Sequence, residues 1–181
     1  MAIYGPTGSG KSTLGRLIGE RLGLPFVELD GIFHRPGWEP TPTEEFRAAV
    51  QEELARNQDG WVVDGNYRSV RDLILPQADT VVWLRLPFRV VFPRLVGRTF
   101  GRAWSRELLW GTNRESWRKS LFTRESILLW SITSWRPHVR RTEQALEEMG
   151  HSASVFELRS PREVEALLAD LGSRDHLRRM L

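Results

Sequence analysis

The chain has 181 residues, a net charge of +3 and no cysteine, and its length suits a single domain spanning residues 1–181. The lack of cysteine excludes disulfides, thiol catalysis and cysteine-ligated zinc. The sequence has no apolar run of about 18 residues and no secretory signal pattern, so we expect a cytoplasmic protein with no membrane partner.

The first motif lies at residues 5–12, which read Gly5-Pro6-Thr7-Gly8-Ser9-Gly10-Lys11-Ser12. It fits G-x-x-x-x-G-K-[ST], the phosphate-binding loop or Walker A motif. An apolar run at 2–4 predicts a strand before the loop, and residues 11–22 predict a helix after it, as the motif requires. We expect the loop to bind ATP phosphates and Ser12 to hold Mg²⁺. The predicted nucleotide-binding residues are Gly5, Gly8, Ser9, Gly10, Lys11, Ser12 and Thr13.

Residues 26–30 predict a second strand that ends in Asp30, on the same sheet edge as the phosphate loop. We expect Asp30 to contact an acceptor substrate, and a turn or cap role is the alternative. A loop at 31–42, rich in proline and glycine, carries His34, Arg35 and Trp38. Loops of this kind often contact ligands, so each is a candidate ligand-binding residue, with packing as the alternative. Arg35 and Trp38 are the predicted acceptor-binding residues. A helix over about 43–57 follows.

The third strand is predicted at 61–65 and contains Asp64. In many phosphate-loop proteins, an aspartate at the end of the neighbouring strand helps to hold Mg²⁺, so Asp64 is a candidate for that role rather than a simple turn residue. Arg68 follows at the same edge. It either binds an anionic acceptor or lies in solvent.

A short helix over 69–75, a strand over 79–86 and a helix over about 88–101 come next. Arginines at four-residue spacing, among them Arg94, Arg98 and Arg102, are predicted to project near one another.

Between Arg85 and Arg141 the chain has thirteen basic and three acidic residues, a local net charge of +10. We interpret the segment at about 102–120 as a lid insert that faces phosphates, made of short helices or mobile chain.

The remaining elements are predicted as a helix over 120–135, a helix from Pro137 to Met149, a strand over 152–158, a helix over 161–171 and a polar tail over 173–181. Five strands that alternate with helices predict an α/β fold in which a five-stranded parallel sheet is covered on both faces.

Three features together resemble the nucleoside-monophosphate-kinase-like branch of phosphate-loop proteins. They are the loop at 5–12, Asp30 after the second strand, and Asp64-Gly65-Asn66-Tyr67-Arg68, which has the Asp-Gly-x-x-Arg spacing of adenylate kinases with Asn-Tyr in place of Phe-Pro. The chain is most similar to bacterial adenylate-kinase-related proteins called topology modulation proteins. The similarity also includes Pro36-Gly37-Trp38 and Leu158-Arg159-Ser160.

The resemblance implies a P-loop NTPase fold with a three-layer α/β/α sandwich and a helical lid. It implies an ATP- and Mg²⁺-dependent phosphotransferase that moves the γ-phosphoryl group to a nucleoside monophosphate or a hydroxylated metabolite. Asp30 would be the base for a hydroxyl acceptor, whereas Arg68 would matter more for a phosphate acceptor. We expect residues 159–162, after the last strand and including Arg159, to contact the adenine. The candidate lid residues are Arg98, Arg102, Arg114 and Arg118.

The alternative function is a nucleotide-gated nucleic-acid-binding or regulatory protein. The basic segment motivates it, because five tryptophans lie between Trp104 and Trp135 and exposed aromatic rings can stack on bases. These tryptophans lie among leucine and isoleucine, which favours packing. A bare ATPase is less well supported, because no residue stands out to orient an attacking water.

Overall fold

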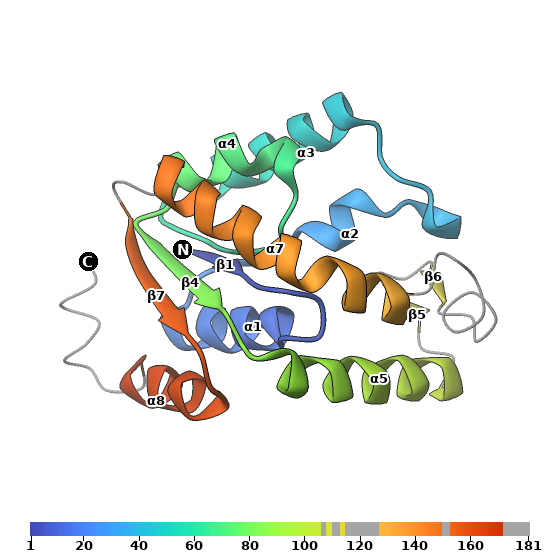
Figure 1. Ribbon diagram of the computed structural model, residues 1–181. Helices are drawn as coiled ribbons and strands as arrows, with labels where there is room; N and C mark the ends of the chain where they lie inside the picture. The colour runs from blue at the N-terminus through green and yellow to red at the C-terminus, as the bar shows by residue number, and fades with distance from the viewer. Residues whose placement is uncertain (106–107, 110–112, 115–126, 150–152, 172–181) are drawn as a thin grey trace.

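The computed structural model describes residues 1–105, 108–109, 113–114, 127–149 and 153–171. Its main sheet is parallel, with strand order β2-β3-β1-β4-β7, and helices cover both faces (Figure 1). The strands are β1 (Ala2–Tyr4), β2 (Phe26–Glu28), β3 (Val62–Asp64), β4 (Thr80–Leu84) and β7 (Ser154–Leu158). The predicted three-layer α/β fold with a five-stranded parallel sheet is therefore confirmed.

The two helical layers are seen edge-on in Figure 1. One layer contains α1 (Lys11–Leu22), α5 (Phe88–Ser105) and α8 (Pro161–Leu171). The opposite layer contains α3 (Thr43–Arg56), α4 (Arg71–Ile74) and α7 (Ile127–Met149). The short elements are α2 (Leu29–Phe33) and the single-turn 3-10 helices η1 (Pro36–Trp38), η2 (Arg68–Val70) and η3 (Leu75–Gln77).

Each central strand divides its side chains between two cores because successive residues point to opposite faces. In β1, Ala2 and Tyr4 pack in the core shared with α3 and α7, whereas Ile3 packs against α1. In β4, Val81 packs in the same core as Ala2 and Tyr4, whereas Val82 packs in the same core as Ile3. Burial on both faces explains why these strands read as continuous apolar runs.

The order of the strands positions the ligand edge. The chain leaves β1 through α1 to the outer strand β2, and later returns on the other side of β1 as β4. Connections that diverge in this way leave a crevice at the carboxyl ends of the strands. The loop after β1 and the segments after β2 and β3 all open at that edge.

The prediction that Asp30 ends the second strand is wrong in detail. The strand ends at Glu28, and Asp30 lies in the first turn of α2. The first half of the predicted loop at 31–42 is therefore partly helical. The reason is tertiary: Leu29 is fully buried in the core, and its packing holds a turn that is too short to be stable alone.

Two further predictions need correction. Pro137 does not open a helix but lies inside α7, where its exposed ring is flanked by Trp135 and Val139, both packed in the same core. The lid insert at about 102–120 was expected to be short helices or mobile chain. Among its described residues, α5 extends to Ser105, and β5 (Leu108–Leu109) pairs antiparallel with β6 (Asn113–Arg114). Glycine and threonine at 111–112, with Asn113, are poor helix formers.

The helix predicted over 69–75 is interrupted, since η2, α4 and η3 follow one another from Arg68 to Gln77. The predicted tail at 173–181 lies outside the described residues. None of the helices in the described part of the chain combines the length and the apolar character needed to cross a bilayer.

We expect Gly19→Ala to lower the free energy of unfolding by about 1–3 kcal/mol, because an added Cβ would lie 2.8 Å from the Leu24 carbonyl oxygen. That backbone atom belongs to the turn in which Leu24 N–H donates to the Gly19 carbonyl at 2.9 Å. The matched control is Gly97→Ala, at an exposed helical position with no atom within 4 Å of the added Cβ. It should stabilise the helix by up to about 1 kcal/mol. Urea unfolding followed by circular dichroism measures the free energy of unfolding of both variants. Equal changes in the two variants would contradict the packing argument.

Candidate active site

The phosphate loop joins β1 to the N-terminus of α1, which begins at Lys11. Gly8 and Gly10 have φ angles of 81° and 94°, in the left-handed region that favours glycine. The Lys11 ammonium donates to the Pro6 carbonyl at 3.1 Å and so lies folded across its own loop. The loop therefore has the strand–loop–helix context that its sequence predicted, with the helix N-terminus available to an anion.

Ser12 and Asp64 meet across the β1–β3 edge. The Ser12 hydroxyl donates to Asp64 Oδ2 at 2.5 Å, and the other carboxylate oxygen, Oδ1, is buried without a hydrogen-bond partner among the described residues. Burial raises the pKa of Asp64, while the Lys11 charge and the Ser12 hydrogen bond lower it. A hydroxyl and a carboxylate are oxygen ligands of the kind that Mg²⁺ prefers, so these residues fit that ion.

No cluster of three acidic or histidine side chains suited to a metal occurs among the described residues. Mg²⁺ usually takes one or two protein ligands and completes its shell with water and substrate phosphates. The unsatisfied Asp64 oxygen is then available to such a hydrated ion.

Asn66 ties the segment after β3 to the start of the phosphate loop. Its side-chain amide accepts from Gly5 N–H at 3.2 Å and donates to the Gly5 carbonyl at 2.6 Å. This pair of bonds holds both backbone groups of the first loop residue. Sequence analysis included Asn66 in the resemblance but assigned it no role.

On the other side of the loop, the Tyr67 hydroxyl donates to Asp30 Oδ1 at 2.6 Å. Burial raises the pKa of Tyr67, and the negative charge of Asp30 adds to this effect. Tyr67 therefore stays protonated and fixes one carboxylate oxygen of Asp30. Glu28 pairs with Asp64 in the register of β2 and β3, so a further carboxylate lies at this edge.

The segment from His34 to Trp38 is anchored to the lid insert. Asn113, only 1% exposed, accepts from Trp38 N–H at 3.0 Å and donates to the Arg35 carbonyl at 3.1 Å. The His34 and Trp38 rings meet edge to face at 5.3 Å. Burial lowers the pKa of His34, so its imidazole is mainly neutral at pH 7.

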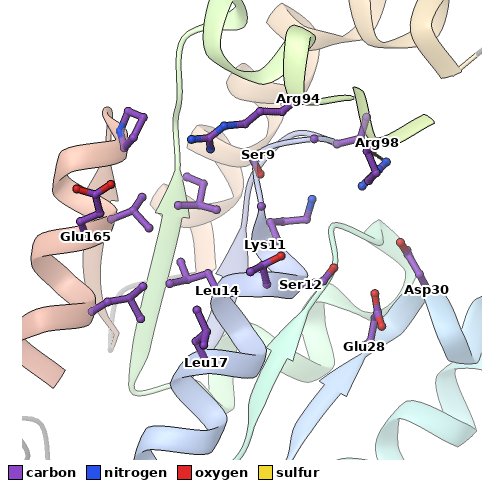
Figure 2. A pocket seen from close by; sticks show the side chains of 18 of the residues that line it. Ser9, Lys11, Ser12, Leu14, Leu17, Glu28, Asp30, Arg94, Arg98 and Glu165 are labelled. Atoms are coloured by element: carbon purple, nitrogen blue, oxygen red, sulfur yellow. Dashed lines mark hydrogen bonds between the residues drawn. The ribbon is translucent and has the colours of Figure 1, made fainter. Parts of the chain in front are cut away.

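A cavity of about 530 Å³ runs along this edge. Figure 2 shows Glu28 and Asp30 on one side, Lys11 and Ser12 in the middle, and Glu165 of α8 on the other side. Arg94 and Arg98 reach it from α5. The lining residues are Thr7, Gly8, Ser9, Gly10, Lys11, Ser12, Thr13, Leu14, Leu17, Glu28, Asp30, His34, Trp38, Leu84, Arg94, Arg98, Pro161, Val164, Glu165 and Leu168.

The cavity brings together most of the predicted site residues but not all of them. Arg35 is exposed and forms an ion pair with Glu45, and Arg68 is exposed; neither lines the cavity. Arg159 is also outside, and its side chain binds Glu157. Arg102 and Arg114 lie in α5 and β6, and their side chains are outside the described residues, as is the whole of Arg118.

Sequence reasoning missed several lining residues. Glu28 was not singled out, and neither were Val164, Glu165 and Leu168 of α8. His34, a candidate from the loop at 31–42, does line the cavity. No local motif marks the α8 residues, because the fold alone brings the last helix beside the first. Arg94 had a signal, its four-residue spacing from Arg98, but it was not placed among the site residues.

His138 of α7 is close to the phosphate loop. Burial lowers the pKa of its imidazole to about 4, and the positive charges of Lys11, Arg71 and Arg141 act in the same direction, while the Gly5 backbone opposes them. The folded protein therefore holds His138 neutral at pH 7.

The sequence and fold were compared with known proteins. A family model described as shikimate kinase matches residues 7–149. No curated protein matches the chain. The family match supports a P-loop kinase family and is not specific for the adenylate-kinase-related branch.

Among solved structures, a shikimate kinase from Acinetobacter baumannii in complex with shikimate has a TM-score of 0.56 and 19% identity, covering 94% of this chain and 88% of that one. A sugar kinase from Janibacter sp. HTCC2649 has a TM-score of 0.53 and 20% identity, covering 93% and 91%. At these identities the similarity shows the fold.

We expect Asn66→Ala to weaken Mg·ATP binding by roughly tenfold. It removes two hydrogen bonds that hold Gly5, and each is worth about 0.5–1.5 kcal/mol. Asn66→Asp should have a similar effect, because a carboxylate cannot donate to the Gly5 carbonyl. Isothermal titration calorimetry measures the dissociation constant of Mg·ATP for each variant. The control is Asn57→Ala, at the end of α3, which should leave affinity unchanged. Unchanged affinity in Asn66→Ala would contradict the role.

Stability should fall as the pH is lowered from 6.5 towards 4, because His138 binds a proton in the unfolded chain but not in the folded one over this range. This group alone should lower the free energy of unfolding by about 2 kcal/mol between pH 7 and pH 5. Urea unfolding at both pH values tests it. His138→Gln does not titrate, so its pH-dependent loss should be smaller by about that amount. An equal loss in both proteins would show that His138 is not the cause.

Proposed function

The chain belongs to the shikimate kinase family, and we propose that it transfers the γ-phosphoryl group of ATP to a hydroxyl group of a small acceptor. It is a P-loop kinase, and kinases of this family use ATP with Mg²⁺. One observation carries the proposal: the Ser12–Asp64 pair and the Asp30 carboxylate flank the same phosphate loop, so a metal site and a base lie on one sheet edge.

Phosphoryl transfer depends on positioning and charge neutralisation more than on covalent chemistry. The backbone N–H groups of residues 8–13 would hold the β- and γ-phosphates, and Lys11 would move from the Pro6 carbonyl to them. Ser12 and, through water, Asp64 would hold Mg²⁺, which neutralises phosphate charge when bound.

Arginines of α5 would neutralise the charge that develops on the transferring group. Arg94 and Arg98 line the cavity on the side of the phosphate loop, and Arg98 Nη2 lies 3.5 Å from Thr7 Oγ1. Arg102 and Arg114, from the proposed lid at about 102–120, would add to them on closure. A closed lid would also exclude water from the phosphoryl group.

Asp30 is the proposed base. Its Oδ1 is held by Tyr67, which leaves Oδ2 to accept the proton of the acceptor hydroxyl. The acceptor oxygen then forms a bond to the γ-phosphorus, the bond from that phosphorus to the β–γ bridging oxygen breaks, and ADP leaves. Arg68 lies outside the cavity, which favours a hydroxyl over a phosphate as the accepting group.

The nucleoside end of ATP would lie against α8. Leu14 and Leu17 of α1 and Val164 and Leu168 of α8 give this end of the cavity an apolar lining. The adenine site is thus proposed between the first and last helices, with Arg159 at its margin. We also propose that the chain is adenylate-kinase-related through its Asp64–Arg68 motif.

The test is ADP formation from Mg·ATP with a panel of hydroxylated metabolites and nucleoside monophosphates. We expect one acceptor class to stimulate turnover and Lys11→Ala to abolish it.

Asp30→Asn should lower kcat by about 10²–10⁴-fold while it leaves ATP affinity unchanged, because it removes the base and not a nucleotide contact. Glu20→Gln, on the exposed face of α1, is the control variant. ADP formation that is independent of any acceptor would overturn the proposal.

A further inference from the structure

One residue of the cavity wall has a strained backbone. Trp38 has a φ angle of 67°, and among the residues that the structure describes it is the one non-glycine residue with positive φ. A bulky side chain rarely occupies this left-handed region, because its Cβ crowds the backbone. Gly37, with a φ of 79°, adopts the same region without that crowding. Such strain persists only where surrounding contacts enforce it, and it is found mostly at functional sites.

The contacts that enforce this conformation come from β6, which packs against the turn that contains Trp38 (Figure 1). The Asn113 side chain accepts from Trp38 N–H at 3.0 Å and donates to the Arg35 carbonyl at 3.1 Å. The same two backbone groups also bond to each other, because Trp38 N–H donates to the Arg35 carbonyl at 3.1 Å and closes the turn. One buried side chain thus binds both partners of the bond that closes the turn.

The arms of this turn are held separately. Arg35 N–H donates to the Glu39 carbonyl at 2.8 Å, and Thr41 N–H donates to the Phe33 carbonyl at 2.8 Å. These bonds fix the two sides of a small hairpin, whereas Asn113 holds its tip. Loss of the Asn113 amide would therefore release the tip and leave the arms in place.

The Trp38 ring connects this tip to the proposed base. It lines the cavity and meets His34 edge to face at 5.3 Å, and His34 meets Phe33 at 5.0 Å. Phe33 lies against Tyr67 at 4.5 Å, and Tyr67 donates to Asp30. A series of rings therefore leads from the strained turn to the Asp30 carboxylate.

Resting on the proposed kinase function, we infer that Asn113 is a positioning residue for acceptor binding. It holds Trp38 in its left-handed conformation and so keeps the indole ring in the cavity wall, beside His34. Asn113 does not itself line the cavity, so it acts through Trp38. Its amide is only 1% exposed, and the turn satisfies both its oxygen and its nitrogen.

Asn113→Ala should raise KM for the acceptor by about tenfold, because it removes two hydrogen bonds from the turn. The value of kcat should change by less than about twofold, since Tyr67 also packs against Phe46 in the core and keeps its bond to Asp30. The dissociation constant of Mg·ATP should stay the same, because other residues hold the phosphate loop.

The assay uses the compound that best stimulates ADP formation from Mg·ATP among glycerol, glucose, gluconate, myo-inositol, AMP and CMP. Asn113→Asp is a second variant in case alanine impairs folding. It can accept from Trp38 N–H but cannot donate to the Arg35 carbonyl, so KM should rise, but less than in Asn113→Ala. Asn57→Ala removes an amide bonded to a backbone carbonyl of α3 and is the matched control. An unchanged KM in both Asn113 variants would overturn the inference and leave the kinase function standing.

A double variant tests whether Asn113 acts through Trp38. Trp38→Gly removes the ring and the strain together, and it should raise the acceptor KM at least as much as Asn113→Ala. Addition of Asn113→Ala to Trp38→Gly should then raise KM no further, because residues that act through one another are not additive. A further rise equal to that of Asn113→Ala alone would show an independent role and overturn the inference.

A spectroscopic readout does not depend on the acceptor. The eight tryptophans can be labelled with 5-fluorotryptophan, and Trp38→Phe identifies the fluorine resonance of Trp38. Asn113→Ala should shift or broaden this resonance, whereas Asn57→Ala should not, and an unchanged resonance would overturn the positioning role. If no compound stimulates ADP formation, the kinase proposal fails, and the Trp38 resonance still decides whether Asn113 positions this ring.

Discussion

The structure depends on the contacts between the phosphate loop and the end of β3. Ser12 donates to Asp64, and Asn66 holds both backbone groups of Gly5, so one short segment fixes the loop at its beginning and its end. Both contacts require β1 and β3 to be adjacent, which the parallel sheet provides. A loop with several glycines has much conformational freedom to lose, and these bonds keep it in the one shape that can surround a phosphate.

Around this fixed loop, the cavity holds charges of both signs. Lys11 and the α5 residues Arg94 and Arg98 line it together with Glu28 and Asp30. The proposed phosphoryl transfer would use both, because cations stabilise the transferring group while a carboxylate takes a proton from the attacking hydroxyl. The Tyr67 hydroxyl fixes one Asp30 oxygen, which would give the proposed base a defined direction.

The outer elements complete the cavity from distant parts of the chain. Helix α8 brings apolar side chains beside α1, and α7 places the neutral His138 near Lys11 and Gly5. Asn113 joins the lid insert to the segment that carries Trp38.

Sequence alone determined the fold class, the phosphate loop and the approximate place of each strand of the main sheet, because glycine spacing and apolar runs are local signals of backbone shape and burial. It also indicated Asp30 and Asp64, since both follow strand patterns. Only the tertiary structure decided that Asp30 lies in a helix, that Arg35 and Arg68 do not line the cavity, and that Glu28 and residues of α8 do. Side-chain direction and long-range neighbours depend on how elements pack, and no short stretch of sequence contains that information.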